Sequence, residues 1–382
     1  MSDTTKPTEG TQGSRRSFLK KAAVAATAAG AATIGFPMVS RAKTVTLKMQ
    51  GAWGGKDIFN DMAVEYVDRV NAMAGGRLKI NYLISGAVVK AFRVQDAVHK
   101  GVLDGGHGVT VYWYGKSKVA SLFGTGPVFG QSAHHGLAWI YRGGGQQLYD
   151  ELIEKLGINT VGFFAMPMPT QPLGWFKKPI RSADDMIGLK YRTVGLAADL
   201  MQEMGLKVTQ LPGGEIVPAL ERGVIEAFEF NNPTSDKSFG AQDVSKVYML
   251  GSYHQAAEFF EIIFNKDKYN SLPKEHQAIL KHAAEAASSS NFFLGMERYS
   301  NDLQWLKNKA GVKIYRTPQS VMNKQLQAWD VMIERLENAD PFFKKVLKSQ
   351  KEFAHRVAYY ELLNSADYKL AFEHYFPGEL GF

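Results

Sequence analysis

Residues 207–230, KVTQLPGGEIVPALERGVIEAFEF, decide the fold because they hold one complete strand–helix–strand unit. The spacing of apolar residues predicts a strand at 207–211, a helix at 215–222 and a second strand at 225–230. The turn at 212–215, Pro-Gly-Gly-Glu, shapes the start of the helix and caps it. Strand, helix and strand in this order are typical of an α/β layer with parallel strands.

Strands and helices alternate in the same way through most of the chain. The periodicity predicts further strands at 44–50, 78–84, 160–165 and 189–193, and one that begins at 109–111. It predicts shorter helices at 58–70, 92–100 and 196–204. After Pro273 the pattern changes to long helices at 274–308, 318–337 and 341–363. We therefore expect the α/β class, with two α/β lobes and a helical C-terminal region.

The composition excludes several classes of function. The chain has 382 residues and no cysteine, so disulfides, thiolate catalysis and thiolate metal sites are ruled out. It contains no P-loop, no dinucleotide fingerprint and no nucleophile elbow. The absence of these motifs argues against an enzyme, so we expect neither catalysis nor an organic cofactor.

The first 42 residues have the pattern of an export signal. Paired arginines at Arg15 and Arg16 precede Phe-Leu-Lys, and an apolar stretch rich in Ala and Gly follows at 22–36. Small residues at Ser40 and Ala42 suit a signal peptidase. This order is typical of a twin-arginine (Tat) signal peptide, with cleavage expected after Ala42 and a periplasmic location. The alternative is an uncleaved anchor, for which the apolar stretch is short.

The net charge falls when this leader is removed. It carries six basic and two acidic residues, so residues 43–382 keep +4 of the chain's formal +8. The remaining charge is scattered, with no dense basic stripe, so nucleic acid is not an expected partner. A mild positive field favours small anionic ligands.

Three segments carry a resemblance to a known family. They are residues 170–176 (TQPLGWF), 188–193 (GLKYRT) and 210–227 (QLPGGEIVPALERGVIEA). Together and in this order they resemble the substrate-binding subunits of TRAP (tripartite ATP-independent periplasmic) transporters, the DctP family. The similarity extends over nearly all of residues 43–382. Within the family, the chain is most similar to the branch that binds 2-oxo acids and lactate together with a cation.

The resemblance implies a two-lobed periplasmic binding protein fold with hinge crossovers. One lobe would hold residues 43–166 and 256–296, and the other would hold residues 167–255 and 297–382, including the C-terminal helices. A protein of this kind captures a small organic monocarboxylate in the cleft between its lobes and delivers it to TRAP membrane permease subunits. The branch also forms dimers through an exchanged C-terminal helix, for which 342–363 is long enough.

Arg192 and Gln171 are the first candidate ligand contacts. Arg192 ends a predicted strand, and a planar guanidinium gives a carboxylate two parallel charge-assisted hydrogen bonds. In the family, the arginine at this position holds the ligand carboxylate. Gln171 matches a glutamine that touches ligand and cation. Tyr112, at the end of the strand expected at 109–111, matches a tyrosine that donates to the ligand from the opposite wall.

The resemblance also implies a cation site, for Na⁺ or Ca²⁺. Glu229 and the main-chain carbonyl of Phe230 match its ligands, and oxygen donors suit both ions. The branch usually has tryptophan where this chain has Phe230, which changes the pocket wall. Gln255 matches a residue that is often glutamate and completes the site, and Glu258 lies close enough to replace it as the partner.

Other interpretations stay open at this stage. An exported enzyme would show turnover or a bound cofactor, and a periplasmic sensor would present its ligand to a receptor in place of a permease. The resemblance also leaves the ligand open, between a small 2-oxo or 2-hydroxy acid and a larger aromatic or aliphatic acid.

Overall fold

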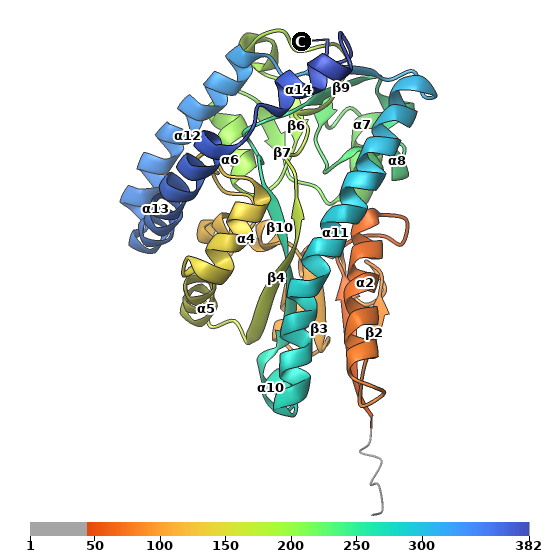
Figure 1. Ribbon diagram of the computed structural model, residues 1–382, viewed down its shortest axis with the longest axis vertical. Coiled ribbons are helices and arrows are strands. Elements are labelled where there is room, and N and C mark those ends of the chain that lie inside the picture. Colours follow the sequence, from red (N-terminus) through yellow and green to blue (C-terminus); the bar gives the residue numbers. More distant parts are fainter. Residues whose placement is uncertain (1–43, 382) are drawn as a thin grey trace, which may run out of the picture. The chain divides into compact units, whose positions relative to one another are not determined.

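Two mixed β-sheets organise residues 44–381, the part of the chain that the computed structural model describes (Figure 1). The signal peptide expected at 1–42 lies outside these residues. The strands follow the chain as β1 Val45–Gly51, β2 Leu78–Leu83, β3 Gly105–Gly108, β4 Thr160–Met168, β5 Gly174–Phe176, β6 Lys190–Arg192, β7 Lys207–Thr209, β8 Ala227–Phe228, β9 Val247–Leu250, β10 Glu258–Asn265 and β11 Lys313–Arg316.

The first sheet has the strand order β2-β1-β3-β10-β4, and the second has the order β11-β9-β5-β8-β6-β7. In the first sheet only β10 is antiparallel to its neighbours, β3 and β4. In the second sheet only β5 is antiparallel, to β8 and β9. The α/β class is confirmed, and the expectation of purely parallel layers is wrong.

Two chain crossings explain the antiparallel strands. The chain leaves the first sheet at the end of β4 and enters the second as β5, and it returns from β9 into the first sheet as β10. Each crossing therefore delivers one strand that runs against its neighbours. All eight residues of β10 are buried, as expected for a central strand covered on both faces. Among the described residues, the crossing segments 169–173 and 251–257 are the only links between strands of the two sheets that contain no helix, because the third link, from β10 to β11, runs through the helices of residues 266–308.

Helices cover both sheets. They are α2 Ile58–Met73, α3 Val94–His99, α4 Ala133–Arg142, α5 Gly145–Lys155, α6 Leu196–Glu203, α7 Ile216–Glu221, α8 Pro233–Ser238, α9 Ala241–Val244, α10 Lys266–Asn270, α11 Lys274–Asn308, α12 Gln319–Ala339, α13 Pro341–Asn364 and α14 Tyr368–Tyr375. Short 3₁₀ turns are η1 Ala91–Arg93, η2 Thr110–Trp113, η3 Lys118–Phe123, η4 Ala183–Met186 and η5 Gly213–Glu215.

The long helices connect the two sheets from outside. In Figure 1, α11 runs beside α2 and past β4. It also packs against α8, the helix that follows strand β8 of the second sheet. Further along, α12 packs on α6, and α13 packs on α4, α5 and η3. Within residues 44–381, no helix is both long enough and apolar enough to cross a bilayer.

The prediction of a strand that begins at 109–111 is wrong. The strand in this region is β3, Gly-Gly-His-Gly, and residues 110–113 form the 3₁₀ turn η2. The glycines hide the strand in the sequence, because strand propensity is read from side chains that β3 lacks. A Cβ on Gly106 would lie 2.7 Å from Val94 Cγ1, so close packing of α3 requires glycine there.

Glu261 on β10 joins η2 and α5 in the core of the first sheet. Trp113 Nε1 donates to its Oε1 at 2.7 Å, and the Tyr149 hydroxyl donates to its Oε2 at 2.9 Å. Burial raises the pKa of Glu261 to about 7, although both hydrogen bonds act to lower it. Between the ordinary pKa of about 4.3 and this value, the folded chain binds a proton that the unfolded chain has lost.

We expect Glu261→Gln to flatten the pH dependence of stability. In the wild type, the contribution of Glu261 is complete below about pH 4.3 and is lost as the pH rises through about 7, by roughly 1–3 kcal/mol. The amide does not titrate, and Tyr149 can accept from it. Urea unfolding from about pH 5 to 8 checks this, with exposed Glu154→Gln as the control. If the free energy of unfolding depended on pH in the same way in Glu261→Gln as in the wild type, Glu261 would be charged in the folded protein.

Candidate functional site

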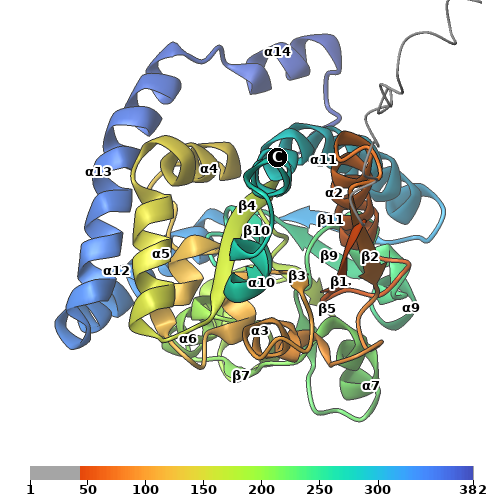
Figure 2. The ribbon, with the colours of Figure 1, turned by 90° about the horizontal axis from the view of Figure 1, so that it is seen from below.

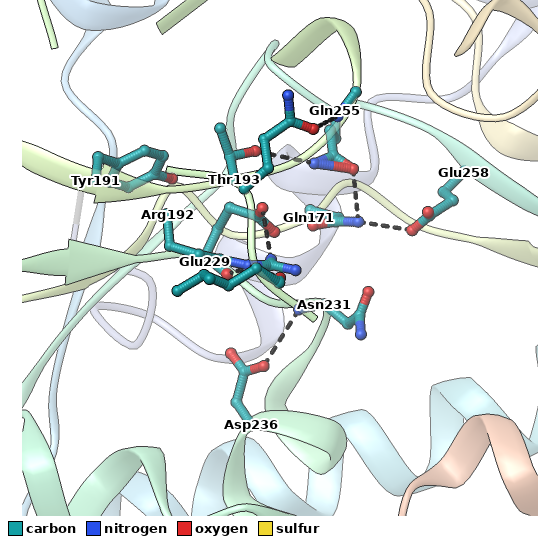
Figure 3. Close-up of polar contacts among 12 residues, drawn as sticks. Gln171, Tyr191, Arg192, Thr193, Glu229, Asn231, Asp236, Gln255 and Glu258 are labelled. Atoms are coloured by element: carbon teal, nitrogen blue, oxygen red, sulfur yellow. Dashed lines mark hydrogen bonds and ion pairs between the residues drawn. The ribbon is translucent and has the colours of Figure 1, made fainter. Parts of the chain in front are cut away.

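Arg192, the last residue of β6, is held rigidly inside the second sheet. Only 1% of it is exposed. Its Nε donates to Leu211 O at 2.8 Å, and its Nη1 donates to Glu229 O at 2.9 Å and to Glu229 Oε1 at 3.0 Å. No described residue accepts a hydrogen bond from its Nη2. The protein thus fixes the guanidinium through two of its nitrogens and leaves the third for another partner (Figure 3).

Strand register explains this placement. Side chains alternate between the faces of a strand, so the neighbouring Tyr191 points away, where its hydroxyl donates to Leu173 O at 2.5 Å. Phe230 follows β8 and lies against the guanidinium, with its ring centroid 5.6 Å from Arg192 Cζ. The turn at Gly213 makes room for this ring, because a Cβ there would lie 2.4 Å from Phe230 Cε2.

Gln171 lies in the first crossing segment and joins it to the second. Its backbone N–H donates to Gln255 O at 3.0 Å. Its Nε2 donates to Gln255 Oε1 at 3.0 Å and to Glu258 Oε2 at 2.6 Å (Figure 3). Gln255 in turn reaches Thr193, beside Arg192, with Nε2 3.4 Å from Oγ1. One polar cluster therefore contains both crossings and the end of β6.

Two carboxyl groups share this cluster with one guanidinium. Burial raises the pKa of Glu229 to about 7, against the opposing effect of the Arg192 charge. Burial raises the pKa of Glu258 to about 8, where the Gln171 hydrogen bond opposes it and the charge of Glu229 adds to it. Both groups are fully buried, so an added positive charge would stabilise their ionised forms.

The oxygen atoms of the cluster fit a hard cation. Glu229 Oε2 and Gln171 Oε1 are buried, and no described residue donates to either. Carboxylate and amide oxygens are ligands that Na⁺ and Ca²⁺ accept. No group of three or more His, Asp or Glu residues within 44–381 is arranged to hold a metal, so a cation here would depend on amide and main-chain oxygens as well.

Tyr112 approaches the cluster from the side of the first sheet. It lies in η2, not at the end of a strand, and packs on Trp53 and Phe92 with ring centroids 5.7 and 4.6 Å away. Burial raises the pKa of Tyr112, and the nearby charge of Arg192 opposes this rise. No hydrogen bond of its hydroxyl is made with a described residue. The structure thus brings Tyr112 near Arg192 without a direct polar contact.

A second buried network joins the two sides of the molecule. Ser235 Oγ on α8 donates to Asp57 Oδ1 at 3.0 Å, and Asp57 caps the start of α2. Asp236 accepts from Trp175 Nε1 at 2.8 Å and from Asn231 N at 3.2 Å, just after Phe230. Burial raises the pKa of Asp57 to about 7 and that of Asp236 to about 6.

No motif in the sequence predicts this network. The polar run Asn231-Asn232, directly after the strand expected at 225–230, is the one signal that points to it. Asp57 has the pattern of a helix cap, and that pattern does not show its contact with α8.

A cavity of about 430 Å³ lies beside the cluster. Its walls include Trp53 and Ala91 on the side of the first sheet, and Pro212, Phe230 and Phe239 on the side of the second. Phe230 belongs both to the cavity and to the contact with Arg192. The arrangement suits a small anion with an apolar part that lies between the two sheets.

Known proteins resemble this chain over most of its length. The family model described as bacterial extracellular solute-binding protein, family 7, matches residues 51–338. A monocarboxylate 2-oxoacid-binding periplasmic protein from Nostoc sp. is 32% identical over 308 residues, which cover 79% of this chain and 82% of that protein.

Two solved structures share the fold. A TRAP periplasmic solute-binding protein from Pseudoalteromonas atlantica, with bound sodium and pyruvate, is 29% identical, with a TM-score of 0.80 over 87% of this chain and 100% of that chain. A TRAP transporter solute-binding protein from Bordetella bronchiseptica is 27% identical, with a TM-score of 0.81 over 88% of this chain and 98% of that chain. The second is a mixed-occupancy dimer with copurified calcium and picolinate in its occupied active site.

Proposed function

Because the chain belongs to family 7 of the bacterial extracellular solute-binding proteins, the DctP family, we propose that it captures a small 2-oxo or 2-hydroxy monocarboxylate for a TRAP transporter. The relatives bind 2-oxo acids, pyruvate or picolinate, all of them organic acids. The TRAP membrane permease subunits are then its partners, and its task is binding and release, not catalysis.

The fixed guanidinium of Arg192 carries this proposal. Three hydrogen bonds to protein oxygens hold it, and its Nη2 has no acceptor among the described residues. A carboxylate at Nη2 would gain charge-assisted hydrogen bonds without ordering the side chain first. Gln171 belongs to the same polar cluster, Tyr112 is close enough to feel the charge of Arg192, and Phe230 lies against the guanidinium.

A Na⁺ or Ca²⁺ ion completes the proposed site. Its ligands are the carboxylate of Glu229, the main-chain carbonyl of Phe230 and the amide oxygens of Gln171 and Gln255. The buried oxygens of Glu229 and Gln171 without donors support this set. When bound, the cation offsets the negative charge that the ligand brings to two buried carboxyl groups.

Capture works by closing the cleft between two lobes. We place one lobe at 43–166 plus 256–296 and the other at 167–255 plus 297–382, with the crossings at 169–173 and 251–257 as the hinge. The boundary at 296 lies inside α11, which packs on elements of both sheets. Closure excludes water, which strengthens the hydrogen bonds at Arg192, and it changes the surface that a permease meets.

Titration with pyruvate and lactate tests the proposed function. We expect micromolar or tighter binding when Na⁺ or Ca²⁺ is present, and binding weaker by at least about tenfold, or ~1.4 kcal/mol, once both are removed by chelation and exchange for choline. Calorimetry measures both. No heat with any organic acid from a folded sample would contradict the proposal, and unchanged affinity without the cations would remove the cation from it.

The leader at 1–42 supports export by the Tat pathway and a periplasmic location for the remaining chain. A twin-arginine signal carries proteins that are already folded, which suits a chain without cysteine. Replacement of Arg15 and Arg16 by lysine should keep the protein in the cytoplasm, as cell fractionation would show.

We also propose a homodimer formed through the C-terminal helices. The first half of α13 is packed on its own chain, with Phe343 and Leu347 buried. Large apolar side chains then become exposed along the end of α13 and along α14, at the edge of the unit in Figure 2: Tyr359, Tyr360, Leu362, Leu363, Tyr368, Leu370 and Tyr375. A second copy of the chain would cover them.

Light scattering tests the dimer. We expect the protein without its leader to be dimeric and the double variant Leu362→Asp, Leu363→Asp to be monomeric, because both side chains are more than 70% exposed and contribute little to the folded chain itself. Ile187→Asp, at another exposed apolar residue, is the control and should stay dimeric. A wild-type monomer at every concentration would contradict the proposal.

A further inference from the structure

Asp199 on α6 binds two side chains that come from the side of the first sheet. The Tyr114 hydroxyl donates to Asp199 Oδ2 at 2.6 Å, and Lys118 Nζ donates to Asp199 Oδ1 at 2.9 Å. The side chain of Asp199 is 15% exposed, and that of Lys118 is 43% exposed. Burial and the Asp199 carboxylate raise the pKa of Tyr114, so its hydroxyl stays protonated and remains a donor.

These contacts join the elements that carry two of the proposed ligand contacts. Asp199 lies in α6, the helix that follows β6 and Arg192. Tyr114 lies at the end of η2, the turn that contains Tyr112. The helix α6 packs on β7 and α12, whereas η2 packs on η3, and η3 packs on α5, which covers β4 of the first sheet. Loss of the Asp199 contacts would therefore let Arg192 and Tyr112 move apart with their own surroundings intact.

Gly195, just before α6, shows how closely the two sides meet. A Cβ on this residue would lie 2.9 Å from Val111 Cβ and 3.1 Å from Ser121 Oγ, and its φ is +64°. Within residues 44–381, the two bonds of Asp199 are the only side-chain hydrogen bonds between α6 and the segment 110–123. The polar part of this contact thus depends on one carboxylate.

We propose that Asp199 is a positioning residue that holds the two lobes closed by binding Tyr114 and Lys118. The proposal rests on the proposed function, which supplies the two lobes and their closure. The bond from Tyr114 contributes most of the effect, because a hydrogen bond to a charged group is stronger than a partly exposed ion pair. A ligand that binds the closed form is bound less tightly when that form is less populated.

Pyruvate binding to Tyr114→Phe and Asp199→Ala tests the proposal. We expect the dissociation constant to rise about tenfold in each variant, mainly through faster dissociation, because the proposed ligand contacts are all kept. Lys118→Met should raise it by less than about threefold. Stopped-flow fluorescence in the presence of Na⁺ and Ca²⁺ measures both rate constants. Wild-type rates in Tyr114→Phe and Asp199→Ala would overturn the proposal.

A matched control and a double variant separate closure from a general effect on α6. Glu203 is an acid on the same helix whose partner, Arg335, lies on α12, so Glu203→Gln should bind as the wild type does. The double variant Tyr114→Phe, Asp199→Ala should bind within about twofold of Asp199→Ala, because both changes remove the same bond. Additive losses, or an equal loss in Glu203→Gln, would overturn the proposal.

A distance measurement without ligand tests closure independently of the proposed function. The chain has no cysteine, so spin labels can be attached at Lys100→Cys and Arg222→Cys, both exposed and on different lobes. Labelled chains are diluted with unlabelled ones, so that the distances within one chain are measured by electron paramagnetic resonance. We expect Tyr114→Phe to shift these distances to longer values and Glu203→Gln to leave them unchanged.

The outcomes distinguish the two proposals. Unchanged distances in Tyr114→Phe would overturn the role of Asp199, even if pyruvate binds to the wild type. Longer distances in Tyr114→Phe, in a protein that binds no organic acid, would support closure by Asp199 while the proposed function fails.

Discussion

Arg192→Ala weakens the binding of 2-oxo acids by at least about 100-fold in our expectation. The side chain is almost fully buried, and its guanidinium is already fixed by Leu211 and Glu229. Truncation of one partner of a buried, hydrogen-bonded charge pair costs roughly 2–5 kcal/mol in binding, because the other charge is left without a partner. Calorimetric titration of folded variant and wild type with the same acid measures the loss.

A second variant separates lost binding from lost folding. Arg192→Ala leaves the Glu229 carboxyl buried without the guanidinium that pairs with it. Because the pKa of Glu229 is already raised to about 7, the carboxyl can take up a proton instead. Arg192→Lys keeps the positive charge but loses hydrogen bonds that hold the guanidinium on Leu211 and Glu229, so we expect it to fold and to bind about tenfold more weakly. Arg222→Ala, at an exposed arginine after α7, should bind as the wild type does. If Arg192→Ala bound 2-oxo acids with the affinity of the wild type, the proposal that Arg192 holds the ligand carboxylate would be wrong.

The sequence predicts those residues of the candidate site that lie at or just after the end of a strand. Arg192 closes β6 and Glu229 follows β8, and parallel neighbouring strands bring their ends together. The sequence did not show that Glu229 holds Arg192 directly, or that Glu258 accepts from Gln171, because such contacts depend on how two distant segments cross. The roles of these residues in ligand and cation binding stay predictions.

The fold was predictable where helix propensity and helix-start signals are strong. The helix expected at 274–308 has these bounds in α11, because Pro273 marks its start and the segment is rich in good helix formers such as Ala, Glu and Lys. The strand β10, Glu-Phe-Phe-Glu-Ile-Ile-Phe-Asn, was not assigned, because burial on both faces removes the alternation that marks a strand. Its antiparallel direction follows from the crossing out of β9, which local sequence does not encode.

Gly174, the first residue of β5, shows how strictly the first crossing is set. Its φ is +126°, a value that residues with a side chain rarely adopt. A Cβ there would lie 2.2 Å from Phe228 O and 2.8 Å from Phe228 C, both backbone atoms of the neighbouring strand. Neither atom can move without parting β5 from β8, the pair that also positions Glu229.

We therefore expect Gly174→Ala to lower the free energy of unfolding by about 3–5 kcal/mol, through backbone strain and the clash together. Gly115→Ala is the matched control, since its added Cβ has no atom within 4 Å and the residue has no positive φ. Urea unfolding followed by circular dichroism compares both with the wild type. If Gly174→Ala were as stable as Gly115→Ala, β5 could shift away from β8 to accommodate the added Cβ. The crossing beside Gln171 would then not hold the site residues in a fixed position.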